Sequence, residues 1–173
     1  VRFRILHGCE ARLVAVGESA IISLNTHSSA GRQRFSLGHE LGHWIRDRQV
    51  GSFACGSDDI GPQNAEAKSV ETRANEFASQ LILPDYLVAP WMIGKHVNFS
   101  IAGELKHEFS SSLTAAAIKM VKRAQVPACI ACHGKTKRHW RVPNLKFPSD
   151  LYVKSELHQE TDAFQMAYRG TPK

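Results

Sequence analysis

The sequence predicts an α+β fold, in which a small antiparallel sheet packs on a helical core and a short β-rich C-terminal appendage follows. Residues 11–25 are rich in β-branched and apolar side chains around a short turn signal, as in a hairpin. Helical spacing then dominates up to residue 124, and a β-like pattern returns after Pro127. The expected boundary therefore separates a domain of residues 1–125 from an extension of residues 126–173.

Composition indicates an ordinary globular protein. The 173 residues are 43% hydrophobic and 22% charged, and this length can bury a core without disulfide bonds. No apolar run is long enough to cross a membrane, and the start lacks the pattern of a secretory signal. The four cysteines do not resemble a secreted disulfide framework. These features predict a cytoplasmic protein without a membrane partner.

The net charge of +6 favours acidic partners and only weak attraction to nucleic acid. A solvated basic surface explains this excess better than a dedicated DNA site does. The basic segment "HGKTKRHWR" (133–141) is interpreted in the same way, as an exposed hairpin turn with nucleic-acid contact as the lesser alternative.

The elements follow in order. "ARLVAV" (11–16) and "AIISLN" (20–25) form the predicted hairpin, and the polar residues 26–33 form a loop. A helix is expected to begin near Arg34 or Phe35 and to run past Ile45.

Residues 51–64 are rich in Gly, Ser and Asp and predict a surface loop. A second helix is expected from about residue 65 to residue 83, because Pro84 disfavours helix at the residue before it. Residues 99–124 form a further helical zone, in which Ser110 to Ser112 occupy an N-cap position. Residues 127–143 predict strand, turn and strand, and residues 151–154 a possible last strand.

The segment "RFSLGHELGHWIRDR" (34–48) carries the main chemical signal. On a helix, His39 and His43 lie one turn apart on one face, so both imidazoles can reach a single zinc ion. Glu40 then flanks the metal and can act as general base. Gly38 and Gly42 leave room for another element to approach closely. The expected core stripe is on roughly the opposite side, which turns the histidines toward solvent or a cleft; it comprises Leu37, Leu41, Trp44 and Ile45.

A third ligand is needed, because catalytic zinc usually has three protein ligands. Glu66, Glu71 and Glu76 compete for this role. Glu76 falls on the polar side of the second helix, and Glu66 lies near its uncertain start. Glu71 sits at the edge of the apolar face, where a carboxylate without a cation would be costly to keep ionised. Glu71 is therefore the preferred ligand. Asn75, one turn later, is either a polar residue of the helix flank or an acceptor for the second ring nitrogen of His39 or His43.

Together these segments resemble a known family. "RQRFSLGHELGH" followed by "ETRANEFASQLILP" resembles the ImmA/IrrE metallopeptidases, which pair a helix carrying H-E-x-x-H with one carrying E-x-x-x-N-x-x-A. The resemblance covers roughly residues 5 to 125. It implies a zincin-like helical core, with Zn²⁺ held by His39, His43 and Glu71, and Glu40 as general base. Several family members cleave a helix-turn-helix repressor and so switch on genes for stress response or element transfer.

The resemblance thus implies a zinc endopeptidase whose partner is a repressor involved in transcription regulation. A second oxyanion donor is expected among four side chains that the sequence does not rank; these are Arg73, Tyr86, His96 and His107. The rival hypothesis is a non-catalytic binding or sensor module that contacts a repressor or nucleic acid. "CIACH" (129–133) matches the covalent haem pattern, but Cys129 and Cys132 are interpreted as ordinary cysteines in or beside a strand.

Overall fold

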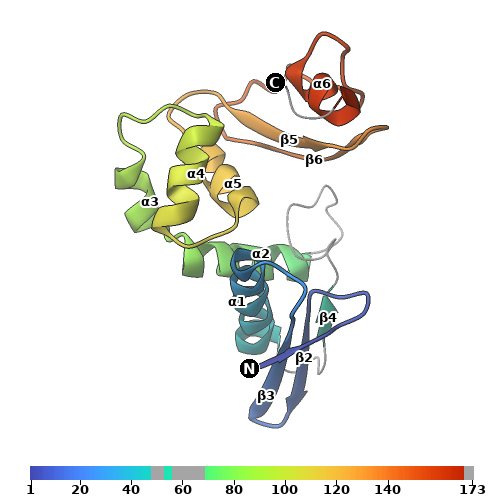
Figure 1. Ribbon diagram of the computed structural model, residues 1–173. Coiled ribbons are helices and arrows are strands. Elements are labelled where there is room, and N and C mark those ends of the chain that lie inside the picture. Colours follow the sequence, from blue (N-terminus) through green and yellow to red (C-terminus); the bar gives the residue numbers. More distant parts are fainter. Residues whose placement is uncertain (48–52, 56–68, 170–173) are drawn as a thin grey trace.

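The computed structural model describes residues 1–47, 53–55 and 69–169 of the chain. A sheet and two long helices form one part, and three helices, a hairpin and a last helix form the other (Figure 1). The mixed helix and strand content confirms the α+β fold. The elements are β1 (Arg2–Arg4), β2 (Ala11–Val16), β3 (Ser19–Asn25), α1 (Ala30–Asp47), β4 (Phe53–Cys55), α2 (Ser69–Ile82), α3 (Asp85–Trp91), α4 (Phe99–Glu108), α5 (Leu113–Arg123), β5 (Cys129–His133), β6 (Arg138–Pro143) and α6 (Asp162–Arg169).

The N-terminal sheet has the strand order β1-β3-β2-β4. The predicted hairpin is present as β2 and β3, and β4 adds to β2 in antiparallel fashion. However, β1 pairs with β3 in parallel, so the sheet is mixed rather than purely antiparallel. Alternate residues of β2 and β3 point to one face and are buried there: Ala11, Leu13, Ile22 and Leu24. This face packs against Phe35, Leu37 and Trp44 of α1.

Helix α1 begins at Ala30, four or five residues before the predicted start. Tertiary contacts support this early turn. A Cβ on Gly31 would lie 2.8 Å from the Ser111 carbonyl oxygen, and the Arg34 guanidinium donates to the Ser110 carbonyl at 2.9 Å. The predicted core stripe of α1 is partly wrong, because Ile45 is 55% exposed.

Strand β4 lies within the segment predicted as a loop, and the rest of residues 51–64 lies outside the described residues. The free edge of β2 supplies its hydrogen-bonding partner. Helix α2 ends within a residue of the predicted stop, while the predicted start at residue 65 also lies outside the described residues.

The zone 99–124 is helical, as predicted, but it is split into α4 and α5. The Ser112 hydroxyl caps α5 by accepting from the Ala115 backbone N–H at 3.1 Å. Helix α3, which follows Pro84, was not predicted from the sequence. These three helices share a core with the end of α2, made of Leu83, Val88, Met92, Ala102, Leu105, Ala116, Ala117, Met120 and Val121.

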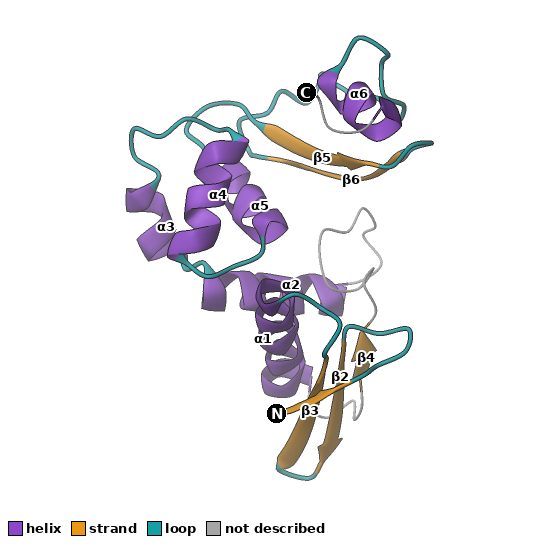
Figure 2. Cartoon of the chain, viewed as in Figure 1, coloured by secondary structure: helices purple, strands orange, loops and turns teal. Residues whose placement is uncertain are grey.

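The predicted strand, turn and strand of residues 127–143 are confirmed as β5 and β6 (Figure 2). The prediction of a strand at residues 151–154 is wrong, because this segment is irregular. Two of its backbone carbonyls instead accept hydrogen bonds from one side chain. The Arg138 guanidinium donates to the carbonyls of Val153 and Lys154. The Asn144 side chain joins the hairpin to the end of α5 through the Val126 carbonyl, at 2.7 Å. The domain boundary near residue 125 stays a prediction.

In the part of the chain that the structure describes, no helix combines the length and apolar character that a membrane span requires.

Candidate metal centre

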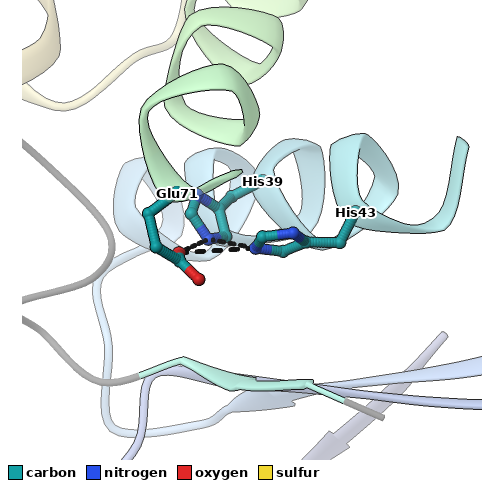
Figure 3. Close-up of side chains that lie close together, drawn as sticks. All are labelled: His39, His43 and Glu71. Atoms are coloured by element: carbon teal, nitrogen blue, oxygen red, sulfur yellow. Dashed lines mark hydrogen bonds and ion pairs between the residues drawn. The ribbon is translucent and has the colours of Figure 1, made fainter. Parts of the chain in front are cut away.

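Helices α1 and α2 approach each other through small residues. A Cβ on Gly38 would lie 3.2 Å from the Ala78 Cα, and one on Gly42 would lie 3.2 Å from the Ala74 Cα. The two glycines thus lie at the place where α1 and α2 cross (Figure 3). The expectation that the glycines admit a second element is confirmed, and the close approach brings side chains of both helices to one point.

Three of the predicted ligands meet at that point (Figure 3). The Nε2 atoms of His39 and His43 are 3.0 Å apart. One carboxylate oxygen of Glu71 lies 3.1 Å from the His39 Nε2 and 3.4 Å from the His43 Nε2. Two imidazole nitrogens and one carboxylate oxygen therefore converge from two adjacent helices.

The face of α1 that carries these histidines is its most buried face. His39, Glu40 and His43 are all 0% exposed, whereas the Glu71 side chain keeps 18% of its surface. The sequence placed the histidines away from the packed side, toward solvent or a cleft. In the structure this face is buried. Of the three candidate ligands, only the Glu71 side chain keeps some exposure to solvent.

Asn75 contacts His39, which is one of the two histidines considered for it. Its Oδ1 lies 3.1 Å from the His39 Nδ1. An amide oxygen only accepts, so the Nδ1 carries the proton, and in the neutral ring the Nε2 then holds a free lone pair. This lone pair points to the same place as the Glu71 oxygen. The contact thus fixes both the tautomer and the orientation of His39.

The Glu71 carboxylate is stabilised in its ionised form. Burial by itself raises the pKa of Glu71, but its contacts with His39 and His43 outweigh this effect, and the pKa falls to about 2. An anionic oxygen and the acceptor nitrogen of His39 therefore face one another, and only a shared positive charge makes this arrangement favourable. A proton on His43 or a metal ion can supply that charge.

The donor set fits a divalent transition metal. Imidazole nitrogen with carboxylate oxygen is a common ligand set for zinc, whereas magnesium and calcium prefer oxygen ligands alone. Tetrahedral zinc with bonds of about 2.0–2.1 Å places neighbouring donors roughly 3.3 Å apart. The three separations of 3.0, 3.1 and 3.4 Å bracket this value.

The remaining candidates lie elsewhere. Glu66 is outside the described residues, and Glu76 is exposed on the polar side of α2. The expected oxyanion donors are spread over other parts of the fold. Tyr86 is exposed on α3, and Arg73 is half-buried on α2. His96 is exposed in the segment before α4, and His107 is exposed on α4 itself. The described geometry does not favour any one of these four side chains as the oxyanion donor.

Ser36 was missed by sequence reasoning. It is 0% exposed, and its hydroxyl has no hydrogen-bond partner among the described residues. It precedes His39 and Glu40 by three and four positions, so it lies on the same helical face. This helical spacing is the sequence signal that could have identified Ser36 as part of the site.

The cysteines of "CIACH" lie in β5, as interpreted. Cys129 and Cys132 are three positions apart on a strand, so their side chains point to opposite faces. Both are free thiols, and burial raises the pKa of Cys129. The basic segment 133–141 forms the end of the hairpin, where the Gly134 N–H donates to the Lys137 carbonyl at 2.9 Å.

Two histidines and a glutamate that converge between two crossing helices of an α+β fold define a protein with a candidate metal site. More particularly, residues 4–120 match the peptidase family described as the IrrE N-terminal-like domain. The match spans more than half of the chain, and the chain belongs to this family. No curated protein matches the chain significantly.

Proposed function

We propose that this protein is a zinc-dependent endopeptidase of the cytoplasm that cleaves a regulatory protein, with helix-turn-helix transcriptional repressors as the substrate class. The observation that carries the proposal is the convergence of His39, His43 and Glu71 with Glu40 buried directly beside them. The family supports peptidase chemistry. The substrate class rests on the resemblance to peptidases that cleave such repressors.

In this proposal, His39, His43 and Glu71 hold the metal. Zinc at this position would acidify water and polarise the scissile carbonyl group. Glu40, one residue after the first ligand, accepts the proton of the attacking water and returns it to the leaving amine. Asn75 holds His39 with its Nε2 toward the centre. The burial of the α1 face excludes bulk water from the charges.

The test is a comparison of the purified chain with its Glu40→Gln variant. Both proteins are expected to contain one zinc ion per chain. Only the original protein should cleave the helix-turn-helix repressor encoded beside it, and the variant should lose roughly 10²–10⁴-fold in rate. Undiminished cleavage of a genuine substrate by the variant would exclude Glu40 as the base.

The rival function, a non-catalytic binding or sensor module, makes a different prediction. Such a module would bind a repressor or DNA without cleaving it, and DNA binding would weaken steeply with salt. A zinc-free chain that binds DNA tightly and leaves every repressor intact would favour this rival.

A further inference from the structure

A cationic cleft adjoins the candidate metal centre. It has a volume of about 600 Å³ and is lined by residues of α1, α2, α5 and β6. This size is within the range of roughly 300–1,000 Å³ that is typical of ligand clefts. Asn75 lines the cleft and also contacts His39, so this residue connects the cleft wall with the metal centre.

The charge of the cleft is strongly one-sided. Among the described residues, seven basic side chains line it, against the single carboxylate of Glu76. The basic residues come from four elements, namely Arg32 and Arg46 of α1, Arg73 of α2, Lys119, Lys122 and Arg123 of α5, and Arg141 of β6. Elements far apart in the sequence thus bring like charges together, which costs free energy unless an anion compensates for it.

Part of this charge is already compensated within the protein. Asp85 pairs with Lys119 at 3.0 Å and also with Arg123, and Glu10 lies 3.8 Å from Arg32. Among the residues that the structure describes, Asp85, Glu10 and Glu76 balance only part of the basic charge of the cleft. Within the described part of the chain, no carboxylate pairs with Arg46, Lys122 or Arg141.

The cleft also has apolar walls. Phe35, Phe77, Ile118 and Val142 line it together with the basic residues. An enclosed surface that mixes aromatic, aliphatic and cationic side chains suits a peptide with both apolar and acidic side chains. A nucleic-acid backbone would favour a more uniformly polar and basic track.

We infer that this cleft binds an acidic segment of the protein substrate. The inference rests on the proposed peptidase function and adds a substrate preference: Asp or Glu near the scissile bond, together with apolar residues. Acidic side chains of the substrate meet Lys122 and Arg141, while the adjoining segment of the peptide passes Asn75 toward the metal centre.

The experiment measures binding separately from cleavage. Three fluorescein-labelled peptides share one apolar sequence and carry Glu, Gln or Lys at alternate positions, and a labelled thymidine oligonucleotide serves as the nucleic-acid probe. Fluorescence anisotropy is recorded with the Glu40→Gln protein at low and high salt. The Glu peptide is expected to bind most tightly and to weaken with salt.

Variants then locate the binding site. The double variant Lys122→Glu with Arg141→Glu is expected to bind the Glu peptide roughly tenfold more weakly or worse, because two partly exposed contacts are reversed. The control Lys106→Glu reverses an exposed charge on α4, outside the cleft, and should bind as before. Thermal unfolding and zinc content verify that all variants fold.

The outcomes separate the two proposals. Equal binding of all three peptides, no binding, tighter binding of the oligonucleotide, or an unaffected double variant would each overturn the acidic-segment inference. Selective binding of the Glu peptide by a protein that neither holds zinc nor cleaves a repressor would overturn the proposed function and leave the cleft assignment standing.

Discussion

Two clusters of buried polar groups in this protein differ in how their charges are balanced. On α5, the Lys119 side chain is only 4% exposed, and its ammonium group pairs with Asp85 at 3.0 Å, beside Arg123. Between α1 and α2, by contrast, two imidazole nitrogens and a carboxylate oxygen converge on one point. In the first cluster, one carboxylate of the chain pairs with both cations. The second cluster can be balanced by a proton on a histidine or by a metal ion, and its set of two imidazoles and one carboxylate is a common ligand set for zinc.

The largest expected effect is in the second cluster. Glu71→Ala removes the anionic ligand and should reduce the zinc content from one ion per chain to near zero, with loss of peptidase activity. Metal analysis by mass spectrometry measures this. The matched control is Glu76→Ala, an exposed carboxylate one turn further along the same helix, which should keep its zinc. Zinc retained in Glu71→Ala would mean that the centre has been misassigned.

Disrupting the ion pairs of Asp85 should lower the stability of the fold and leave the metal content unchanged. Asp85→Ala leaves Lys119 buried without its partner, and because Asp85 is 27% exposed we expect a loss on the order of 2 kcal/mol, below the value for a fully buried pair. The exposed pair Lys95–Glu104 is the control, and Glu104→Ala should change stability by less than about 0.5 kcal/mol. Urea unfolding measures both. Equal effects in the two variants would show that the burial of Lys119 has no energetic importance.

The same cluster predicts a pH dependence. Burial raises the pKa of Asp85, but the bonds from Gln80, Lys119 and Arg123 outweigh this and lower it below its ordinary value. A lowered pKa in the folded state adds stability above the unfolded pKa of about 3.9, and this stability disappears as the pH falls toward the folded value. Unfolding free energies of Asp85→Ala should therefore fall less steeply below about pH 4 than those of the original protein.

Variants of Asn75 test whether its contact with His39 orients that ligand in the metal centre. Asn75→Ala removes the acceptor of the His39 Nδ1 proton, and the affinity for zinc is expected to fall about 10–100-fold. Competition with a chromophoric chelator measures the affinity. Asn75→Asp keeps an acceptor oxygen and should bind zinc more tightly than Asn75→Ala. If both variants bind zinc as the original protein does, the contact has no role in metal binding.

The smallest expected effect tests the helix contact that brings the two ligand sets together. Gly42→Ala places a Cβ 3.2 Å from the Ala74 Cα and 3.3 Å from the Phe77 ring, and should destabilise the fold by about 1 kcal/mol after its gain in helix propensity. Gly103→Ala is the matched control on α4, where a Cβ would meet no atom within 4 Å, and it should stabilise by about 0.5–1 kcal/mol. Differences in thermal midpoint measure both. A stabilised Gly42→Ala variant would show that the close approach of α1 and α2 is not required.

Local sequence patterns predicted the elements whose structure depends on residues close together in the chain. The β2–β3 hairpin, the stop of α2 before Pro84 and the Ser112 cap of α5 all follow from turn, proline and capping chemistry within a few residues. Elements that depend on distant partners were missed or misplaced. β4 requires the free edge of β2, the start of α1 requires Ser110 and Ser111, and the segment 151–154 is held by Arg138 in place of a strand partner.

The sequence by itself determined the chemical groups of the site. The spacing of His39 and His43 places them on one helical face, and the position of Glu71 at the edge of the apolar face of α2 made it the preferred partner, because a helical period is a local property. Only the tertiary structure decided that the histidine face is buried beneath α2, that Asn75 contacts His39, and that basic residues of four elements line one cleft. These features depend on how helices pack, and packing is set by contacts between residues that are far apart in the chain.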